Sequence, residues 1–263
     1  IKKIKEIQDL ILEGEVYELN YCLPFEHNVS GFNPFQFQVN LLKKSPVPMA
    51  SFLRIDQTYL CGASMERNLK KEGNLLFSQP IKGTIKKSSD LDEDALLIKA
   101  LEDSEKDKAE NVMIVDLVRN DLGRICETGS IKVNELFGIY SYLQVHQMIS
   151  TVSGQLKSRT SFTDILRASF PMGSMTGAPK ISAMKNIESL EDFKRGWYSG
   201  SVGYIKPNGD FDLNVVIRSA IFDQEQSKLA YFAGGAITID SNPESEWKEV
   251  KLKTKAISEL LTS

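Results

Sequence analysis

Two acidic pairs of this chain have a spacing that could support chemistry. Asp107 and Glu110 lie three residues apart in DKAENVMIVDLVRNDLGR, and Glu246 and Glu249 repeat that spacing near the C-terminus. Residues three apart on a helix face the same side, and a hard cation such as Mg²⁺ prefers carboxylate oxygens completed by water. Ordinary charges at the border of a buried helix face would show the same spacing. The pattern alone leaves both interpretations open.

A lysine inside an otherwise apolar turn is a second candidate. In SQPIKGTIKKS, residues 78–88, Lys82 stands between Pro80, which fixes φ, and Gly83, which permits a close backbone approach. Thr84 adds a hydroxyl. Taken by itself the stretch favours a surface lysine whose stem lies on apolar neighbours.

A glycine-rich turn, FPMGSMTGAPK, leads into a helix predicted to open at Pro179. Free backbone N–H groups at such a start suit a carboxylate or a phosphate. The turn is not a nucleotide P-loop, because Gly173 and Gly177 are separated by three residues rather than four and Lys180 is not followed by the required pattern. A purely structural turn is the simpler interpretation of this stretch alone.

The composition excludes several classes of function. The 263 residues are 41% hydrophobic and 25% charged with a net charge of −3, so electrostatics give no case for nucleic acid binding. No apolar run approaches the roughly 20 residues of a membrane helix, so we expect no membrane association. Three cysteines without metal spacing and two histidines indicate reduced thiols in a cytoplasmic protein and exclude a histidine-rich metal site.

The elements that must position these residues follow from periodicity. Helices are expected at 1–14, 91–126, 163–168 and after Pro179, and strands at 16–25, 49–55, 58–64, 74–81, 130–136 and 145–156. A β-meander is expected over 196–239, with a hairpin turn at Asn208-Gly209. Because strands come in groups, an α+β fold is favoured over a doubly wound sheet. We expect one domain over residues 1–263, and the helical pattern at Ile1 suggests that an N-terminal part of a longer protein is missing.

The last predicted helix begins near Pro243. Its apolar residues step by three and four, which predicts one buried face, made of Trp247, Val250, Thr254, Ile257 and Leu261. Glu246, Glu249 and Lys253 follow the same steps one position earlier. These three residues are therefore expected at the edge of the buried face rather than on the solvated side.

Taken together, these stretches resemble the chorismate-utilising enzymes, the family of anthranilate, aminodeoxychorismate, isochorismate and salicylate synthases. The matching blocks are GEVYELN, SMER, PIKGT, AENVMIVDLVRNDLGRIC, FPMGSMTGAPK, GWYSGSVGY, NVVIRSAIF and AGGAITIDSNPESEW. They run from about Gly14 to Lys253. The resemblance implies two antiparallel sheets packed face to face, with helices outside and an active-site cleft between them.

Within this family, Lys82 separates the branches. Anthranilate synthases typically carry alanine in a PIAGT motif, whereas a lysine resembles component I of the aminodeoxychorismate synthases, in 4-aminobenzoate and folate biosynthesis. Asn111 also resembles that branch, because anthranilate synthases usually have histidine there. An anthranilate synthase component I and a non-catalytic chorismate-binding subunit are the alternatives. Isochorismate and salicylate synthases are weaker ones, because Glu18 stands where they have a base lysine.

The resemblance also assigns roles. Lys82 is implied as the nucleophile that attacks C2 of chorismate, and Glu66 as the general acid that protonates the departing 4-hydroxyl. Mg²⁺ would be held by Glu110 and Glu249 with support from Asp107 and Glu246. The implied substrate contacts are Arg218, Tyr198, Lys253, Gly235 and Ala236 at the enolpyruvyl carboxylate and Gly83, Thr84 and Thr176 at the ring.

The chain departs from the family pattern at four positions. They are Glu18, Gln147 in place of a common histidine beside His146, Met172 in place of a glycine, and Asp107 in place of a longer glutamate. No glutaminase motif surrounds any cysteine, so the resemblance implies a separate glutamine amidotransferase subunit as the source of ammonia. A separate lyase would complete 4-aminobenzoate.

Overall fold

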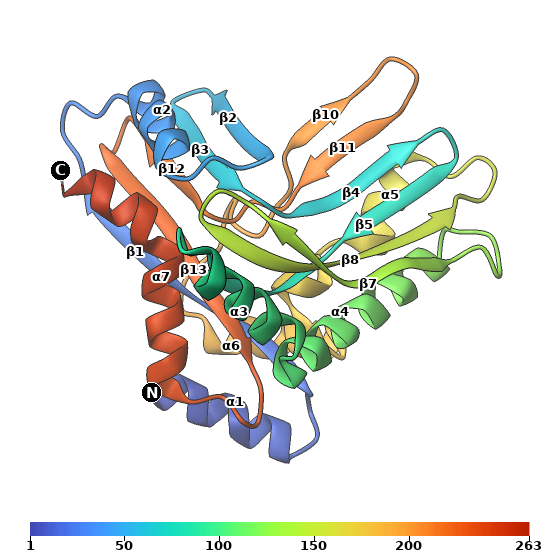
Figure 1. Cartoon of the computed structure of the whole chain (residues 1–263). Helices are drawn as coiled ribbons and strands as arrows, with labels where there is room; N and C mark the ends of the chain where they lie inside the picture. Colours follow the sequence, from blue (N-terminus) through green and yellow to red (C-terminus); the bar gives the residue numbers. More distant parts are fainter. Residues whose placement is uncertain (263) are drawn as a thin grey trace. The chain divides into compact units, whose positions relative to one another are not determined.

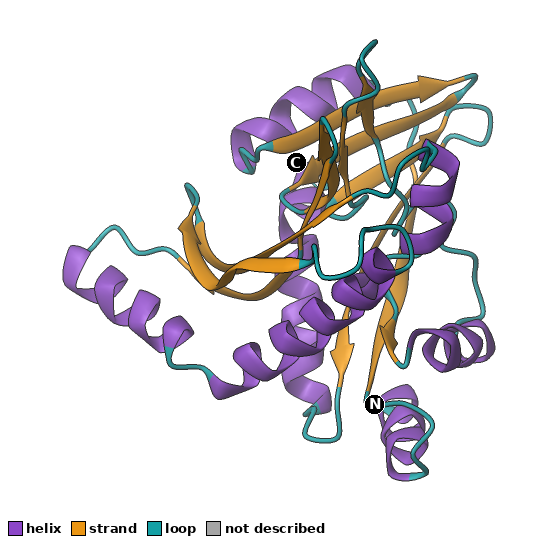
Figure 2. Ribbon diagram, turned by 90° about the vertical axis from the view of Figure 1, so that its right-hand side faces the viewer, coloured by secondary structure: helices purple, strands orange, loops and turns teal. Residues whose placement is uncertain are grey.

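The computed structural model describes residues 1–262. The chain divides into two compact units: the first comprises 1–65, 175–202 and the chain from Val215 on, and the second comprises 66–174 and 203–214. Each unit is built on one antiparallel sheet with helices along it (Figures 1 and 2). The α+β class with two antiparallel sheets is therefore confirmed. One chorismate-binding catalytic domain over 1–263 stays a prediction.

The first unit contains a six-stranded sheet in the order β2-β3-β12-β13-β1-β9. The long strands β1 and β13 pair along ten residues, with Leu19 opposite Ile237 and Asn28 opposite Lys228. Helix α7 lies along β13 (Figure 1). The elements are α1 (Lys2–Leu12), β1 (Glu18–Asn28), α2 (Pro34–Lys44), β2 (Met49–Ile55), β3 (Thr58–Ser64), β9 (Gly177–Ala178), α6 (Lys180–Leu190), β12 (Ser219–Asp223), β13 (Lys228–Ile237) and α7 (Pro243–Leu261).

The second unit contains a seven-stranded sheet in the order β10-β11-β4-β5-β8-β6, with β7 also paired to β8. Helices α3 and α4 follow one another beside β6, β7 and β8 (Figure 1). The elements are β4 (Arg67–Glu72), β5 (Leu75–Gln79), β6 (Ile81–Lys86), α3 (Leu91–Glu102), α4 (Glu105–Gly123), β7 (Lys132–Ser141), β8 (Val145–Gln155), α5 (Phe162–Ser169), β10 (Gly203–Ile205) and β11 (Phe211–Asn214). The short 3₁₀ helix η1 (Gly173–Met175) spans the passage of the chain from this unit to the other.

Each sheet buries its own core. In the second unit Leu69, Leu76, Val115, Val152 and Phe211 form one cluster with neighbours on α4 and α5. The first unit has two clusters, one under α2 and α7 and one under α1 and α6. Because interiors pack at nearly crystalline density, these clusters give the candidate site residues rigid supports.

The predicted meander over 196–239 is wrong as one continuous sheet, although its two hairpins, β10 with β11 and β12 with β13, form. The apolar run 211–222 is not one strand: β11 ends at Asn214 and belongs to the seven-stranded sheet, whereas β12 begins at Ser219 in the six-stranded sheet. Arg218, just before β12, has a φ of +51°, a left-handed conformation that ends the extended run. Apolar residues dominate both strands and the segment between them, so the sequence pattern alone could not reveal the change of sheet. The Asn208-Gly209 hairpin between β10 and β11 is confirmed.

The expected helix over 91–126 is two helices. Helix α3 ends at Glu102, and Ser104 begins α4 by accepting a hydrogen bond from the Asp107 N–H. Helix α2 was not expected, although its start carried a signal: Asn33 accepts from the Gln36 N–H and Pro34 takes the first helical position. Strands β4 and β6 were also not predicted, because neither shows a clean alternation.

Helix α7 begins at Pro243 as predicted, but its buried face differs from the prediction. Trp247 is 44% exposed, so its place in the buried face is wrong, whereas Glu246 is 6% exposed. Val250, Thr254 and Ile257 are buried as expected. The buried stripe therefore begins with a carboxylate, which lies deeper than the edge position that the sequence predicted.

Candidate active site

Lys82 and Glu110 face each other in the second unit. Lys82 lies on β6 with its side chain 10% exposed, and its Nζ is 3.8 Å from Oε2 of Glu110 on α4. Lys106, one helical turn earlier on α4, places its Nζ 3.7 Å from the other oxygen, Oε1. Lys82 is therefore not a solvated surface lysine, which the stretch alone had favoured. It is a largely buried amine beside a largely buried carboxylate.

Gly83 explains how α3 and α4 come this close to β6. Its φ is +88°, and a Cβ there would lie 3.0 Å from both Asp107 Cβ and Leu101 Cδ1. The pairing of β6 with β8 also shifts register between Ile81 and Thr84. A side chain at Gly83 would meet both the left-handed backbone and the two helices. The close approach predicted from the sequence is thus confirmed.

Asp107 combines two contacts in the first turn of α4. Its Oδ2 accepts a hydrogen bond from the Ser104 hydroxyl at 2.5 Å, while its Cβ lies against Gly83. The carboxylate is thus already engaged at the start of the helix. A supporting role for Asp107 at a metal stays a prediction.

Glu66 is buried immediately before β4. The following residue fixes the strand: Arg67 binds both oxygens of Asp212 on β11, at 2.8 and 3.0 Å, and also donates to Gln79 on β5. A bidentate arginine pair is geometrically specific. The main chain at Glu66 is therefore held by the sheet itself, which suits a positioned acid.

The acids of the first unit converge over strand β13. A Cβ at Gly235 would lie 3.1 Å from Glu246 Oε2, 3.8 Å from Glu249 Oε1 and 3.9 Å from Lys253 Nζ. Glu246 Oε1 accepts from the Ser241 hydroxyl at 2.8 Å, and Lys253 Nζ lies 2.5 Å from Glu249 Oε1. Lys253 also donates to the Gly234 carbonyl at 2.8 Å. The sequence placed Glu246, Glu249 and Lys253 on one predicted element and Gly235 on another, and the structure brings the three side chains together at Gly235.

Arg218 is fixed beside the same helix. Its Nη1 donates to the Lys253 carbonyl at 2.8 Å. Burial lowers the pKa of Arg218, and the nearby Tyr198 and Glu249 offset only part of that shift. An arginine nevertheless keeps its charge in proteins. A charged arginine in a place of low hydration is suited to gripping a carboxylate.

Tyr198 is buried against Phe232 of β13, with ring centroids 5.2 Å apart. Its hydroxyl accepts from the Cys22 thiol at 3.7 Å. Burial raises the pKa of Tyr198 well above 10, so its hydroxyl keeps its proton. Two other predicted contacts lie nearby in the sheet: Ala236 is opposite Asn20 in the register of β13 with β1, and the carbonyl of Thr176 accepts from the Asn20 N–H at 2.7 Å.

Sequence reasoning missed a buried ion pair in this unit, Glu191 with Arg195. Arg195 donates to both oxygens of Glu191, at 2.9 and 2.7 Å, and to the carbonyls of Met175 and Asn20, at 2.7 and 2.9 Å. Burial alone would lower the pKa of Arg195, but the Glu191 carboxylate raises it overall. Glu191 and Arg195 stand four apart just before the GWYSGSVGY block, a spacing that could have suggested the pair.

The pair supports the predicted substrate contacts without being one of them. Glu191 Oε1 also accepts from the Cys22 N–H at 3.1 Å, and the Arg195 carbonyl accepts from the Tyr198 N–H at 3.0 Å. Arg195 therefore links three segments. They are the turn that carries Tyr198, the main chain at Met175, which precedes Thr176, and strand β1 at Asn20. Its position makes it a support for the residues predicted to contact the substrate in this unit.

Three of the four positions that depart from the family pattern, Glu18, Gln147 and Met172, are buried, and Asp107 is half-buried. His146 cannot stand in for Gln147, because consecutive strand residues point to opposite faces and the His146 ring is bound to Asp94 and Ser141, each at 2.8 Å. Asn111 accepts from the Ser150 hydroxyl at 2.5 Å and so ties α4 to β8. Glu18 and Met172 are 1% and 5% exposed.

The predicted metal ligands lie in both units, Asp107 and Glu110 in the second and Glu246 and Glu249 in the first. In the part of the chain that the structure describes, no group of three or more His, Cys, Asp or Glu side chains is arranged to hold a metal. Magnesium commonly uses only one or two protein carboxylates and completes its shell with water and substrate oxygens. The oxygens of Glu246 and Glu249 facing Gly235 fit that requirement, as does Glu110.

Among residues 1–262 no helix is both long enough and apolar enough to span a bilayer. The three cysteines, Cys22, Cys61 and Cys126, are free thiols and buried. Burial raises the pKa of Cys22 to about 11 and that of Cys61 to about 12. A raised pKa leaves less of the reactive thiolate at neutral pH.

Comparison with known proteins agrees with this geometry. Residues 1–259 match the family described as chorismate binding enzyme. The chain is 44% identical to the chloroplastic aminodeoxychorismate synthase of Arabidopsis thaliana over 97% of its length and 28% of that protein. It is 39% identical to anthranilate synthase component 1 of Saccharolobus solfataricus, over 97% of the chain and 60% of that protein.

A solved structure is also similar. Anthranilate synthase component I from Streptococcus pneumoniae matches with a TM-score of 0.88 and 33% identity, over 98% of this chain and 56% of that one. The chain therefore spans between about a quarter and three fifths of the length of these relatives. Relatives with two different named activities match at similar identity, so overall similarity does not separate those activities.

Proposed function

The chain belongs to the chorismate binding enzymes, and from that premise we propose that it is the catalytic part of an aminodeoxychorismate synthase. It would convert chorismate and ammonia into 4-amino-4-deoxychorismate, as component I of such an enzyme. The relative named aminodeoxychorismate synthase at 44% identity supports this proposal.

The observation that carries the proposal is the position of Lys82. The amine is 10% exposed and lies beside Glu110, in a motif where anthranilate synthases typically have alanine. Burying a lysine is costly unless it is paired or used. A nucleophilic amine accounts for the lysine, its burial and its position beside a predicted metal ligand together.

The proposed reaction has two substitutions. The neutral Lys82 amine forms a bond to C2, the ring double bond shifts, and the C4–O bond breaks as Glu66 gives its proton, so that water leaves. Ammonia then forms a bond to C4, the double bond returns, and the C2–N bond to Lys82 breaks. The sum is chorismate plus ammonia giving aminodeoxychorismate plus water. The burial of Glu66 and the neighbouring Arg67–Asp212 ion pair, which fixes the start of β4, support the role of Glu66 as the acid.

The first unit is assigned the enolpyruvyl carboxylate. Arg218 supplies a charged guanidinium, Tyr198 a protonated hydroxyl and Lys253 an ammonium close to Gly235. Magnesium bound by Glu110 and Glu249, with Glu246 and Asp107 in support, would supply positive charge that lets a dianion approach these carboxylates. Their contacts with Ser241 and Ser104 hold Glu246 and Asp107 in fixed orientations.

The ammonia is assigned to a separate glutamine amidotransferase subunit. Two of the similar proteins are named as components of a larger enzyme, and the buried thiols with raised pKa values do not suit glutamine hydrolysis. With ammonium salts as the nitrogen source, the chain should not need that subunit.

The alternative is an anthranilate synthase component I, favoured by the similarity to the Saccharolobus and Streptococcus proteins. Mass spectrometry of the products from chorismate, ammonium and Mg²⁺ distinguishes the two. Aminodeoxychorismate supports the proposal, and fluorescent anthranilate with release of pyruvate overturns it. Calorimetric binding of chorismate without any turnover would indicate a non-catalytic binding protein instead.

A further inference from the structure

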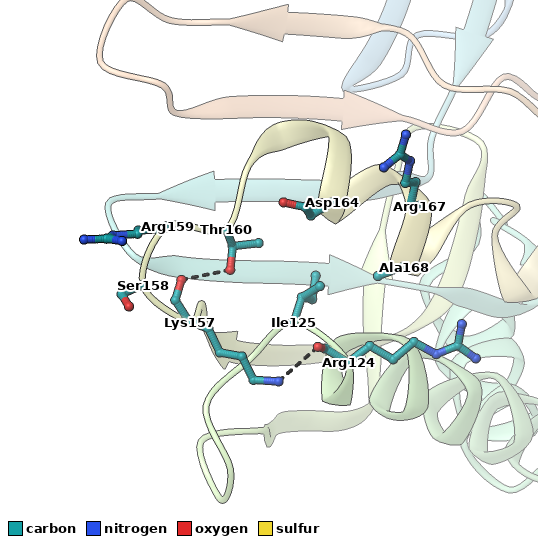
Figure 3. A pocket seen from close by; sticks show the side chains of 9 residues that line it. All are labelled: Arg124, Ile125, Lys157, Ser158, Arg159, Thr160, Asp164, Arg167 and Ala168. Atoms are coloured by element: carbon teal, nitrogen blue, oxygen red, sulfur yellow. Dashed lines mark hydrogen bonds between the residues drawn. The ribbon is translucent and has the colours of Figure 1, made fainter.

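A basic hollow in the second unit has no role in the chemistry proposed above. Its volume is about 500 Å³, and it is formed by the end of α4, the turn 157–160 and helix α5 (Figure 3). None of its lining residues belongs to the predicted chorismate or magnesium set. The volume falls within the range of small-molecule sites, roughly 300–1,000 Å³.

The lining is strongly cationic. Arg124, Lys157, Arg159 and Arg167 line the hollow together with one carboxylate, Asp164. These four cations and one anion give a local charge of +3, in a chain whose net charge is −3. None of the four cations makes an ion pair within 4.0 Å in the described part of the chain, residues 1–262.

Asp164 offsets one of the four positive charges, but its carboxylate is held by the start of helix α5. Its Oδ2 accepts from the Ser161 hydroxyl at 2.6 Å and from the Ser161 N–H at 3.0 Å, and the Asp164 N–H returns a bond to Ser161. These bonds, from the hydroxyl and then the N–H, lower the pKa of Asp164. The carboxylate is thus held in a capping box at the helix start.

The hollow has a rigid frame. Ile125 and Ala168 in its lining belong to the buried core of the unit. Lys157 is bound by its Nζ to the Arg124 carbonyl at 3.0 Å and by its N–H to the Ile125 carbonyl at 3.0 Å, and its own carbonyl accepts from the Thr160 hydroxyl at 2.8 Å. The turn is therefore preorganised.

Arg159 adds a sign of function at the tip of this turn. Its φ is +66°, a left-handed conformation that glycine or asparagine would adopt more easily. Residues in such rarely populated backbone conformations are kept there by the surrounding structure, and they are more frequent at binding sites than elsewhere. In Figure 3 Arg159, Arg167 and Arg124 leave the hollow in different directions, so their charges are spread around it rather than focused on one point.

We infer that this hollow binds a small polyanion with at least two separated anionic groups. The spread cations would pair with the separate anionic groups. Arginine forks match carboxylate and phosphate groups equally in geometry, so a polycarboxylate and a phosphate ester share the required chemistry.

Calorimetric titration of the chain tests this inference, with pyrophosphate and benzene-1,3,5-tricarboxylate as probes. We expect one saturable site, with a dissociation constant below about 1 mM at low salt for at least one probe. The probe that binds more tightly identifies the phosphate or the carboxylate source. The double variant Arg159→Gln/Arg167→Gln should weaken binding at least about tenfold, because both cations are lost. The matched double variant Lys194→Gln/Lys206→Gln removes two exposed charges elsewhere and should bind as the wild type does.

Three results would overturn the inference. The first is equal weakening by the two double variants, which would mean a general charge effect. The second is loss of binding in Arg218→Lys but not in Arg159→Gln/Arg167→Gln, which would place the probe at the predicted chorismate contacts. The third is binding of a poly-glutamate peptide without binding of either small probe, which would make the hollow a protein-docking surface. Because the titration requires no turnover, its outcome is independent of the proposed function.

Discussion

The Nζ of Lys82 lies 3.8 Å from Oε2 of Glu110, so the predicted nucleophile and a predicted metal ligand are neighbours. A carboxylate this close to the amine favours its charged form, in which it cannot attack carbon. Any cation that engages Glu110 would relieve that pairing. The contact thus links the predicted magnesium requirement to the predicted role of the lysine, and both can be tested.

Substitutions of Lys82 distinguish a role as a nucleophile from a role as a positive charge only. Lys82→Arg keeps a positive charge beside Glu110 but supplies no neutral amine at any usable pH. We expect both Lys82→Arg and Lys82→Ala to lower aminodeoxychorismate formation at least about a hundredfold, the lower end for a positioned catalytic group. Product analysis by mass spectrometry measures this loss and also detects any C2-amino product or anthranilate made by the alanine variant. Near-normal synthesis by Lys82→Arg would contradict the covalent mechanism.

Neutralising the carboxylates should change the magnesium requirement. Glu110→Gln and Glu249→Gln should each raise the Mg²⁺ concentration for half-maximal turnover at least about tenfold, because a neutral amide holds the cation less well. Glu244→Gln, an exposed position in the first turn of α7, is the matched control. Full activity of the wild type in excess chelator would show that no divalent cation is needed.

Arg195 should affect substrate binding through the groups it holds. Arg195→Ala leaves the buried Glu191 carboxylate unpaired and should cost about 3 kcal/mol of unfolding free energy, measured by denaturant titration. Arg195→Lys keeps the charge but loses bonds to the Met175 or Asn20 carbonyls. We expect its Michaelis constant for chorismate to rise about tenfold with a smaller change in kcat, since a lost bond to a charged group costs about 1.5 kcal/mol. An unchanged Michaelis constant would limit Arg195 to a role in stability.

Acid should destabilise the second unit through Asp94. The His146 ring and then the Ser88 N–H lower the pKa of Asp94 below its usual 3.8. A carboxyl group whose pKa is lower in the folded chain than in the unfolded chain stabilises the fold at pH values above its unfolded-state pKa. This stabilisation is lost as the pH falls through its folded-state pKa. Between about pH 5 and pH 3 the wild type should lose more thermal stability than Asp94→Asn. Thermal unfolding at the two pH values measures the difference, and His146→Asn should behave like Asp94→Asn. Equal losses in all three proteins would contradict the contribution.

The sequence by itself determined the fold class, the family and most of the elements. Helix α1 ends before Gly14 and α6 begins after Pro179 because those residues act through local backbone conformation. Grouped strands favoured an α+β fold, and the ordered motif blocks indicated the chorismate family. The spacing of Glu246, Glu249 and Lys253 placed all three on one side of α7, where they lie.

The tertiary structure decided what local patterns do not encode. The apolar pattern of 211–222 is the same whether these residues form one strand or two strands in different sheets, so only the packing assigns β11 and β12 to different sheets. The burial of Glu246 in place of Trp247 depends on what α7 packs against, namely β13 at Gly235. The neighbours Lys82 and Glu110 are 28 residues apart in sequence, and Arg195 reaches Asn20 across 175 residues. Contacts of that range depend on chain topology, because they form only after the sheets and helices have packed.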